Sequence, residues 1–318
     1  MRLARSVPFP CVFVLVDCAS LQQTDIVRLL SMKKPSNSVS SFLYASPTAS
    51  KTASLDLGFG RSCAVWVNQN DHVFYEQLEG HTFSFYVRGG LGVWRVDEKP
   101  VHGWPGAICI FPHGQSSEWV ISQPLEMVHL YLPDQELRRM YSEWTDRDGR
   151  MLDLADITYA PAGDLAQPFA HLHRALGSTN VIGAEEAMLD LIGHVIAQDR
   201  FCEHRMARLA GGLAPSVKRR LVDYIEAHLD QSIRLRSLAQ IAGLSEYHLQ
   251  RSFKQSCGVS PNVWIAHRKL ERAKAMIRAG GSLVQVADSC GFSSQSHFTR
   301  SFRSGMGMTP ASYRASAI

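Results

Sequence analysis

The chain has 318 residues, of which 45% are hydrophobic and 19% are charged. This length excludes a single small domain and suits two domains that each bury a core. The net charge of +4 is unevenly distributed, because residues 211–318 carry net +9 and residues 51–210 carry net −8. A basic C-terminal part suits a polyanionic partner, since neutralised phosphates release counterions.

The first 40 residues superficially resemble a secretory leader, with Arg2 and Arg5 before an apolar run. Two prolines break the helix of that run and Asp17 interrupts it. We therefore interpret residues 1–40 as a poorly ordered extension, with Met32 as an alternative start.

The seven cysteines are widely spaced and form no CxxC pair. This favours reduced thiols in a cytoplasm over a disulfide framework or structural zinc. No apolar run approaches the roughly twenty residues of a membrane span. We expect a cytoplasmic protein without a membrane partner.

Residues 41–208 begin with short apolar runs separated by turn residues, such as TFSFYVRGG, GAICIFP and LEMVHLYLP. Many short strands without intervening helices predict an antiparallel β-barrel or jelly roll. The stretch from Pro105 to Gly114 resembles the corresponding part of cupin-like domains. After Leu132 the apolar spacing becomes helical, so we expect flanking helices, one of them near residues 184–198.

Metal-binding cupins use an HxH pair, a Glu and a later His. This region contains no HxH, and Ser117 stands where the later histidine would follow. The histidines are isolated from one another: His72, His81, His102, His113 and His129. We therefore expect no metal, no other cofactor and no enzymatic activity, which leaves a binding pocket. A cupin dioxygenase or isomerase is the rival interpretation, and bound Fe, Mn or Zn would support it.

The lining of that pocket is predicted from strand alternation. Residues 83, 85 and 87 share one strand face while 84, 86 and 88 share the other, and residues 127–132 alternate in the same way. A ligand-reading face mixes aromatic and polar groups. The candidate ligand-binding residues are Tyr86, Trp94, His129 and Tyr131.

A linker at residues 209–215 separates the two parts, and Ser216 is the predicted N-cap of the next helix. Residues 216–318 form the predicted second domain. Within it one pattern occurs twice, as GLSEYHLQRSF from Gly243 and as GFSSQSHFTRSF from Gly291. The second copy has one extra residue between its glycine and its helix. A repeat of this kind indicates a duplicated supersecondary unit.

Each copy has the parts of a helix-turn-helix. In the first, Gly243 suits the turn, Ser245 suits the N-cap, and Leu249 and Phe253 are expected to be buried. In the second, Ser293 is the predicted N-cap, and Phe298 and Phe302 are the predicted core. A helix that starts at Pro261 is expected to space the two units.

The doubled motif, the connecting helix and the closing GMTPASYR resemble the arabinose-regulator (AraC/XylS) family of transcription factors, over about residues 216–314. In this family a cupin-like sensor often precedes the DNA-binding domain. The resemblance implies that two recognition helices enter adjacent major grooves of double-stranded DNA. The predicted DNA-binding residues are Glu246, Tyr247, Gln250, Arg251, Ser294, Gln295, Ser296 and Arg300.

Together these features predict an α+β protein of two domains, with an antiparallel sensor and an all-α double helix-turn-helix. The resemblance implies a transcription activator that contacts RNA polymerase, responds to a small-molecule effector and forms a homodimer. The opposite net charges of the two parts predict that one docks on the other. A DNA-repair alkyl-transfer fusion is a further rival, and the scattered cysteines argue against it.

Overall fold

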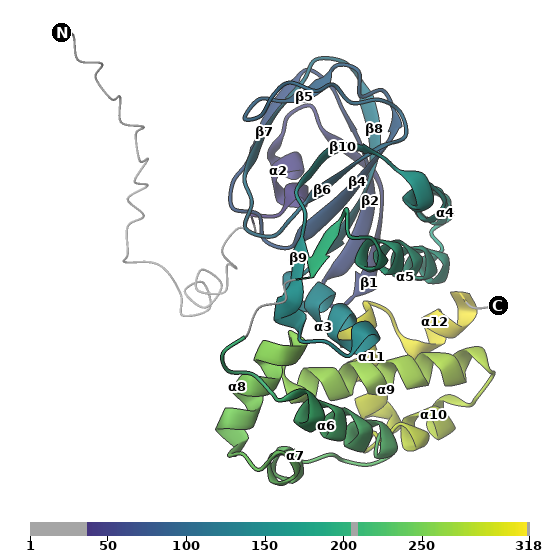
Figure 1. The fold of residues 1–318 in the computed structure, drawn as a ribbon. Helices are drawn as coiled ribbons and strands as arrows, with labels where there is room; N and C mark the ends of the chain where they lie inside the picture. The colour runs from purple at the N-terminus through teal and green to yellow at the C-terminus, as the bar shows by residue number, and fades with distance from the viewer. Residues whose placement is uncertain (1–36, 205–208, 317–318) are drawn as a thin grey trace, which may run out of the picture. The chain divides into compact units, whose positions relative to one another are not determined.

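The structure, a computed structural model, describes residues 37–204 and 209–316 (Figure 1). Its first part contains a six-stranded antiparallel sheet with the strand order β1-β2-β8-β4-β6-β10. The strands are β1 (Ser50–Gly58), β2 (Arg61–Asn68), β8 (Leu125–Leu132), β4 (His81–Arg88), β6 (Ala107–Phe111) and β10 (Ile157–Pro161).

A three-stranded antiparallel sheet faces it, with the order β3-β7-β5. Its strands are β3 (Asp71–Tyr75), β7 (Ser117–Ile121) and β5 (Val93–Arg95), while β9 (Leu152–Leu154) and β11 (Cys202–His204) pair separately. Among the described strands, β1 and β10 are edges of the larger sheet. The domain is therefore an open double-sheet sandwich, which confirms the predicted antiparallel jelly-roll type of fold, and its described strands do not close into a barrel.

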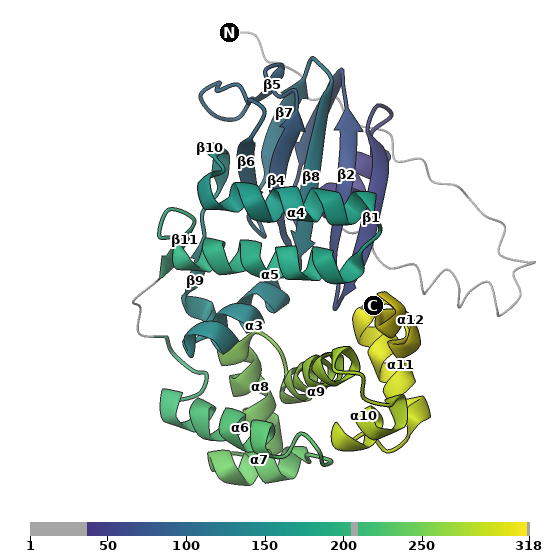
Figure 2. The ribbon, with the colours of Figure 1, turned by 90° about the vertical axis from the view of Figure 1, so that its right-hand side faces the viewer.

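Four helices accompany these sheets: α2 (Val39–Ala45), α3 (Asp134–Thr145), α4 (Ala166–Gly177) and α5 (Val181–Ala197). Two short 3-10 turns lie between them, η1 (Gly149–Met151) and η2 (Gly163–Leu165). Figure 2 shows α4 and α5 lying across one face of the large sheet. One core fills the space between this face and the helices, and a second, more aromatic core lies between the two sheets.

The second part is all helical: α6 (Pro215–Ala227), α7 (Leu235–Ala242), α8 (Glu246–Cys257), α9 (Pro261–Arg278), α10 (Leu283–Ser289), α11 (Gln295–Met306) and α12 (Pro310–Ser316). It has two cores, one for each half. Helix α9 supplies Trp264 and Ile265 to the first core and Leu270, Ala273 and Ile277 to the second. The predicted spacer helix is thus also the shared wall of both cores.

Two predicted boundaries differ from the structure. Helix α6 begins at Pro215, and its N-cap residue Ala214 makes no side-chain cap hydrogen bond, so the prediction of Ser216 as the cap is wrong. Proline has no N–H to satisfy and its φ is preset, so the helix starts with it. Helix α2 begins at Val39, capped by Ser38, inside the stretch expected to be an extension. The remainder of that extension, residues 1–36, lies outside the described residues.

No helix in the described ranges is long and apolar enough to cross a membrane.

Candidate nucleic-acid interface and sensor site

The first helix-turn-helix consists of α7 and α8. Gly243 ends α7 in the left-handed region with φ 67°, which glycine adopts without a Cβ penalty. Ser245 then caps α8 by accepting a hydrogen bond from the His248 backbone N–H at 3.2 Å, as predicted. Leu249 and Phe253 are fully buried. This packing fixes which face of α8 remains in solvent.

The second unit consists of α10 and α11, and its cap differs from the prediction. Ser294, not Ser293, is the N-cap of α11, and its Oγ accepts from the His297 N–H at 3.1 Å. Ser293 Oγ instead lies 3.0 Å from His297 Nδ1. The extra residue of this copy lengthens the turn and moves the cap by one position. Phe298 and Phe302 are buried, as predicted.

A buried lysine joins the two units to the spacer helix. Lys269 Nζ donates to the Gln231 carbonyl at 2.9 Å and to the Gly291 carbonyl at 2.8 Å. Those carbonyls follow α6 and precede α11, so one ammonium group fastens a loop of each unit. Burial lowers the pKa of Lys269. Sequence reasoning missed this residue, because a lysine on a basic helix suggests a solvated charge.

All eight predicted DNA-binding residues are exposed in the structure. They lie at the start and along one side of α8 and α11, and Tyr247 is 79% exposed. An aromatic side chain this exposed has no packing role within the described chain, and exposed tyrosine and arginine side chains are typical of binding surfaces.

Two basic residues of α6 that could have met phosphate face the sensor domain instead. Lys218 is buried and donates to the carbonyls of Ser142 and Arg147, and burial lowers its pKa. Arg219 pairs with Asp146 at 2.7 Å. Helix α6 is therefore an attachment point, and nothing in the sequence distinguished these cations from phosphate ligands.

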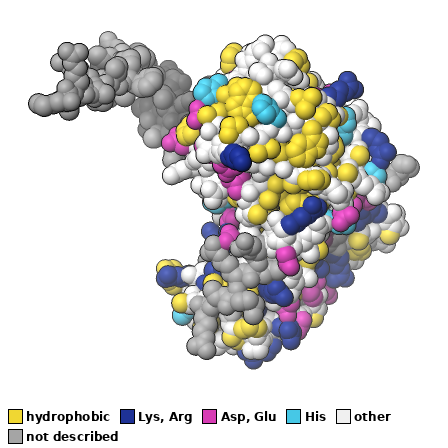
Figure 3. Space-filling model, turned by 45° about the horizontal axis from the view of Figure 1, so that its top comes forward, with side chains coloured by type: hydrophobic (Ala, Val, Ile, Leu, Met, Phe, Trp, Pro, Cys, Tyr) yellow, Lys and Arg dark blue, Asp and Glu magenta, His cyan; other side chains and the backbone are white. Residues whose placement is uncertain are grey.

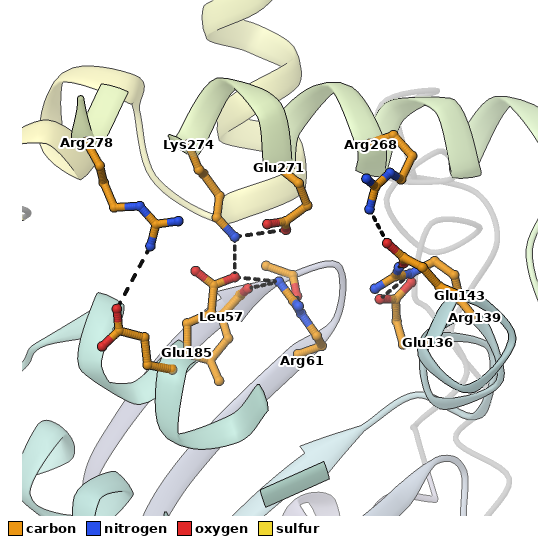
Figure 4. Close-up of polar contacts among 12 residues, drawn as sticks. Leu57, Arg61, Glu136, Arg139, Glu143, Glu185, Arg268, Glu271, Lys274 and Arg278 are labelled. Atoms are coloured by element: carbon orange, nitrogen blue, oxygen red, sulfur yellow. Dashed lines mark hydrogen bonds and ion pairs between the residues drawn. The ribbon is translucent and has the colours of Figure 1, made fainter. Parts of the chain in front are cut away.

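The two domains also meet at a buried carboxylate, Glu185 of α5 (Figure 4). Lys274 of α9 lies 2.6 Å from it, and Arg61 of β2 lies 3.4 Å from the same oxygen. All three side chains are at most 4% exposed. Arg61 also donates to the backbone carbonyls of Leu57 and Gly58. A buried charge on α5 with partners on β2 and α9 holds these three segments in one arrangement.

A second charged cluster joins α3 to α9. Arg268 pairs with Glu226 at 2.6 Å and also with Glu143. His267 Nε2 lies 2.9 Å from a carboxylate oxygen of Glu136. Burial favours the neutral form of Glu136, but His267 and Arg139 hold the pKa of this carboxyl below its usual range.

The turn between β1 and β2 inserts into the helical domain. Phe59 has a positive φ of 53°, its N–H donates to the Gly305 carbonyl at 2.7 Å, and its ring stacks on His267. A Cβ on Gly58 would lie 2.0 Å from the Gly305 oxygen. Glycine at position 58 is thus required both by its φ of 76° and by this close approach.

The structure brings three of the four predicted ligand-binding residues together. Tyr86, His129 and Tyr131 belong to the core between the two sheets or point into it. His129 Nδ1 lies 2.9 Å from the Tyr131 hydroxyl, which accepts from Trp66 Nε1 at 2.8 Å. Trp66 was not predicted as a site residue. It lies two residues after Ala64 on β2, and Ala64 is the cross-strand partner of His129, so strand alternation places Trp66 on the same inner face of the sheet.

Trp94, the fourth candidate, lies apart from the others. Its strand neighbours Val93 and Arg95 are buried, so Trp94 is on the outer face of the small sheet, where its ring packs beside His102. Exposed apolar side chains surround β5 and β3, including Leu91, Val96 and Phe74. Figure 3 shows hydrophobic side chains gathered on this side of the domain. The prediction that Trp94 shares a pocket with the other three is not supported by this geometry.

The described residues contain no group of three His, Cys, Asp or Glu side chains placed to hold a metal ion. Burial raises the pKa of the Cys63, Cys109 and Cys257 thiols to about 12. These thiols stay protonated at neutral pH and are poor nucleophiles.

An antiparallel sandwich followed by two helix-turn-helix units defines a class of two-domain, DNA-binding transcription regulators. Comparison with known families agrees: residues 61–192 match the AraC-like ligand binding domain, and residues 238–316 match a helix-turn-helix domain. The chain belongs to the AraC family of transcriptional regulators, which consists of DNA-binding regulators rather than enzymes.

Individual relatives match mainly the C-terminal part. The probable transcriptional regulator LumQ of Photobacterium leiognathi is 38% identical over 96 residues, 30% of this chain and 39% of that protein. The probable transcription factor PqrA of Proteus vulgaris is 33% identical over 105 residues, 32% of this chain and 86% of that protein. An AraC-type regulator structure from Chromobacterium violaceum is 30% identical, covering 32% of this chain and 92% of its own, with a TM-score of 0.30.

Proposed function

We propose that the chain is a sequence-specific transcription activator that binds double-stranded DNA through α8 and α11. The observation that carries this proposal is the paired exposure of polar side chains on these two helices. Gln250 and Arg251 on α8, and Gln295 and Arg300 on α11, are exposed. Arginine and glutamine form bidentate hydrogen bonds with the major-groove edges of guanine and adenine.

The connection between the two helices supports adjacent grooves as the target. Helix α9 has 18 residues, so it is about 27 Å long. Lys269 fastens a loop of each unit to it, which limits their relative motion. We propose that the two helices read half-elements about 10 base pairs apart on one face of the duplex.

We further propose that the sensor domain binds a small-molecule effector and controls how the DNA-binding domain is held. The match to an AraC-like ligand binding domain and the charged contacts between the domains support this. The docking leaves the recognition residues exposed, so it would act on the relative orientation of the two units rather than by covering them. Contact with RNA polymerase, homodimerisation and a cytoplasmic location belong to the same proposal and rest on the family alone.

The spacing of the half-elements tests the DNA part of the proposal. The full-length protein is footprinted on a duplex selected from random sequence and on the same duplex with five base pairs inserted between the halves. Protection of two elements, and a large loss of affinity on insertion, is the expected result, because half a helical turn moves one element to the opposite face. A single short protected element, or unchanged affinity, would contradict it.

The docking part is tested by comparing the affinities of segment 209–318 and of the full-length chain for the same duplex. PqrA consists almost wholly of the matching segment, which supports independent folding. If docking restrains the two units, the segment binds more tightly than the effector-free full chain, by about 5- to 150-fold. If the sensor domain only dimerises the protein, the segment binds less tightly.

A further inference from the structure

Two neighbouring residues on the inner side of the large sheet each have a buried polar atom without a partner. Ser84 Oγ and His129 Nε2 have no hydrogen-bond partner, and both side chains are 1% exposed. The two residues are direct cross-strand partners on β4 and β8, so both point into the space between the sheets. Buried polar groups are nearly always satisfied, so an adjacent pair that is not requires an explanation.

The hydrogen bonds around His129 determine whether its unpartnered Nε2 atom is a donor or an acceptor. Trp66 Nε1 can only donate, and it donates to the Tyr131 hydroxyl. The Ser40 hydroxyl also interacts with this oxygen. The phenolic proton of Tyr131 is therefore directed at His129 Nδ1, which leaves the imidazole proton on Nε2. Burial lowers the pKa of His129 to about 3, so the ring is neutral and Nε2–H is an unused donor.

The pair lies on a row that crosses the sheet and in which the side chains other than His129 are small. Strand register places Ser54, Ala64, His129, Ser84 and Cys109 side by side on β1, β2, β8, β4 and β6. The neighbouring rows on the same face carry larger groups. Trp66, Met127 and Tyr86 lie on one side, and Tyr131, Thr82 and Phe111 lie on the other. The row therefore lies between one row that carries Trp66 and Tyr86 and another that carries Tyr131 and Phe111.

A cavity opens onto the β1 end of this row. It has a volume of about 310 Å³ and is lined by Ser54 and Ala64, the first two residues of the row, together with Tyr131 and Ser40 of α2. This volume is at the lower end of the range for small-molecule sites. The cavity therefore adjoins the residues that lead to His129.

The charges near the row favour a neutral ligand. Arg95 of the small sheet reaches the same core beside Trp119, but its guanidinium is held by Asp97 and Asp156, each at 2.9 Å. His129 is neutral. The cavity at the β1 end of the row is also lined by Lys51, Asp56 and Arg61. An anionic group placed beside Ser84 and His129 would nevertheless be desolvated with no free countercharge next to these two residues.

We propose that the effector site of the sensor domain is this row, and that it takes an uncharged organic molecule with a hydrogen-bond-accepting oxygen. The oxygen accepts from His129 Nε2–H and Ser84 Oγ–H, and the apolar body lies over Ala64 towards the cavity. This inference rests on the proposed effector binding and specifies the chemical class of the effector.

The test uses the full-length protein and three probes of one shape. Acetophenone has the acceptor oxygen, α-methylstyrene replaces it with a methylene group, and benzoate adds a negative charge. We expect calorimetry to show acetophenone binding at least about tenfold more tightly than either of the others, since a site built to hydrogen-bond rejects the analogue that lacks the group. Nitrogen-15 NMR of the histidine ring is expected to show the proton on Nε2.

Variants assign the preference to the two residues. Ser84→Ala removes only a hydroxyl, and His129→Phe removes the ring N–H. In each variant, acetophenone and α-methylstyrene are expected to bind with nearly equal affinity. Trp94→Phe, on the outer face, is the matched control and keeps the preference. Any one of four results would overturn the proposal. In the unaltered protein these are equal affinities for acetophenone and α-methylstyrene, tighter binding of benzoate than of acetophenone, or no binding of any probe at about 1 mM. In Ser84→Ala it is an unchanged preference for acetophenone. The footprinting experiment needs no ligand, so a failure here is distinguishable from a failure of DNA binding.

Discussion

Burial divides the basic residues of the helical domain into two groups with different roles. Arg251 and Arg300 are exposed on the recognition helices. Lys218, Lys269 and Lys274 are buried and bind carbonyls or a carboxylate inside the protein. The net +9 of residues 211–318 therefore overstates the charge that could face DNA. Base reading is assigned to exposed groups alone.

Arg251→Ala tests that assignment on α8. We expect it to relax discrimination at one base position by about 1–3 kcal/mol, because a bidentate contact to a guanine edge is lost. Lys254→Ala, an exposed cation on the same helix, is the control and should weaken cognate and scrambled duplexes alike. Affinities measured for both duplexes at fixed salt distinguish the two effects. If Arg251→Ala leaves discrimination intact, Arg251 does not read a base.

Among the elements, α9 has the most varied role. One part of its surface is shared by the two helix-turn-helix cores, and another carries His267, Arg268 and Lys274 towards the sensor domain. The β1–β2 turn reaches the same helix through the Phe59 ring. The cavity beside the proposed ligand row is also lined by Gly60 and Arg61 of this turn and strand. A ligand there would lie next to the element that contacts α9.

Lys274→Met tests whether the Glu185 cluster holds the domains together. The variant leaves a buried carboxylate with Arg61 as its remaining partner, and breaking a buried pair costs about 3–5 kcal/mol. We expect urea unfolding of the full chain to change from one transition to two. The control Arg278→Met removes an exposed contact of 3.9 Å to Glu186 and should shift stability by less than about 1 kcal/mol. Identical unfolding curves for the two variants would show that the cluster does not hold the domains.

Because the ion pairs of this contact are largely buried, added salt screens them weakly. The opposite net charges of the two parts suggest a salt-sensitive docking, but the contact instead depends on a few desolvated pairs and on the close approach of Gly58 to Gly305.

For the whole molecule, the buried histidines make stability depend on pH. Burial lowers the pKa values of His81, His129 and His267 in the folded chain. Below about pH 6.5 the unfolded chain binds protons that the folded chain does not, so the free energy of unfolding falls as the pH falls. The loss amounts to up to about 1.4 kcal/mol per pH unit for each histidine.

We therefore expect the urea midpoint to decrease between pH 7.5 and pH 5.5, before most carboxylates titrate. Circular dichroism at several pH values in this window measures it. The carboxyls with lowered pKa values, Glu136 and Asp148 among them, add their loss only in more acidic solution. A midpoint that stays constant down to pH 5.5 would contradict the assignment of these histidines as neutral.

The sequence by itself determined the features that depend on neighbouring residues. The helix-turn-helix units follow from apolar residues four apart, from Gly243 in the turn and from Ser245 at the cap, and all of these interactions lie within one or two helical turns. Most strands of the sensor domain followed from local alternation in the same way. Exposure of the recognition residues also followed, because burying one side of a helix leaves the other side in solvent.

Only the tertiary structure decided the rest, because it depends on segments distant in the chain. Strand β10 follows α3 in the chain and returns to pair with β6, where it forms one edge of the large sheet. Lys269 and Lys274 are ordinary surface lysines in the sequence, and their roles depend on carbonyls and a carboxylate supplied by other elements. Trp94 and Tyr86 are both strand aromatics, and the pairing of β5 with β7 places Trp94 on the outer face. Local periodicity assigns a residue to a face, whereas the fold determines what that face contacts.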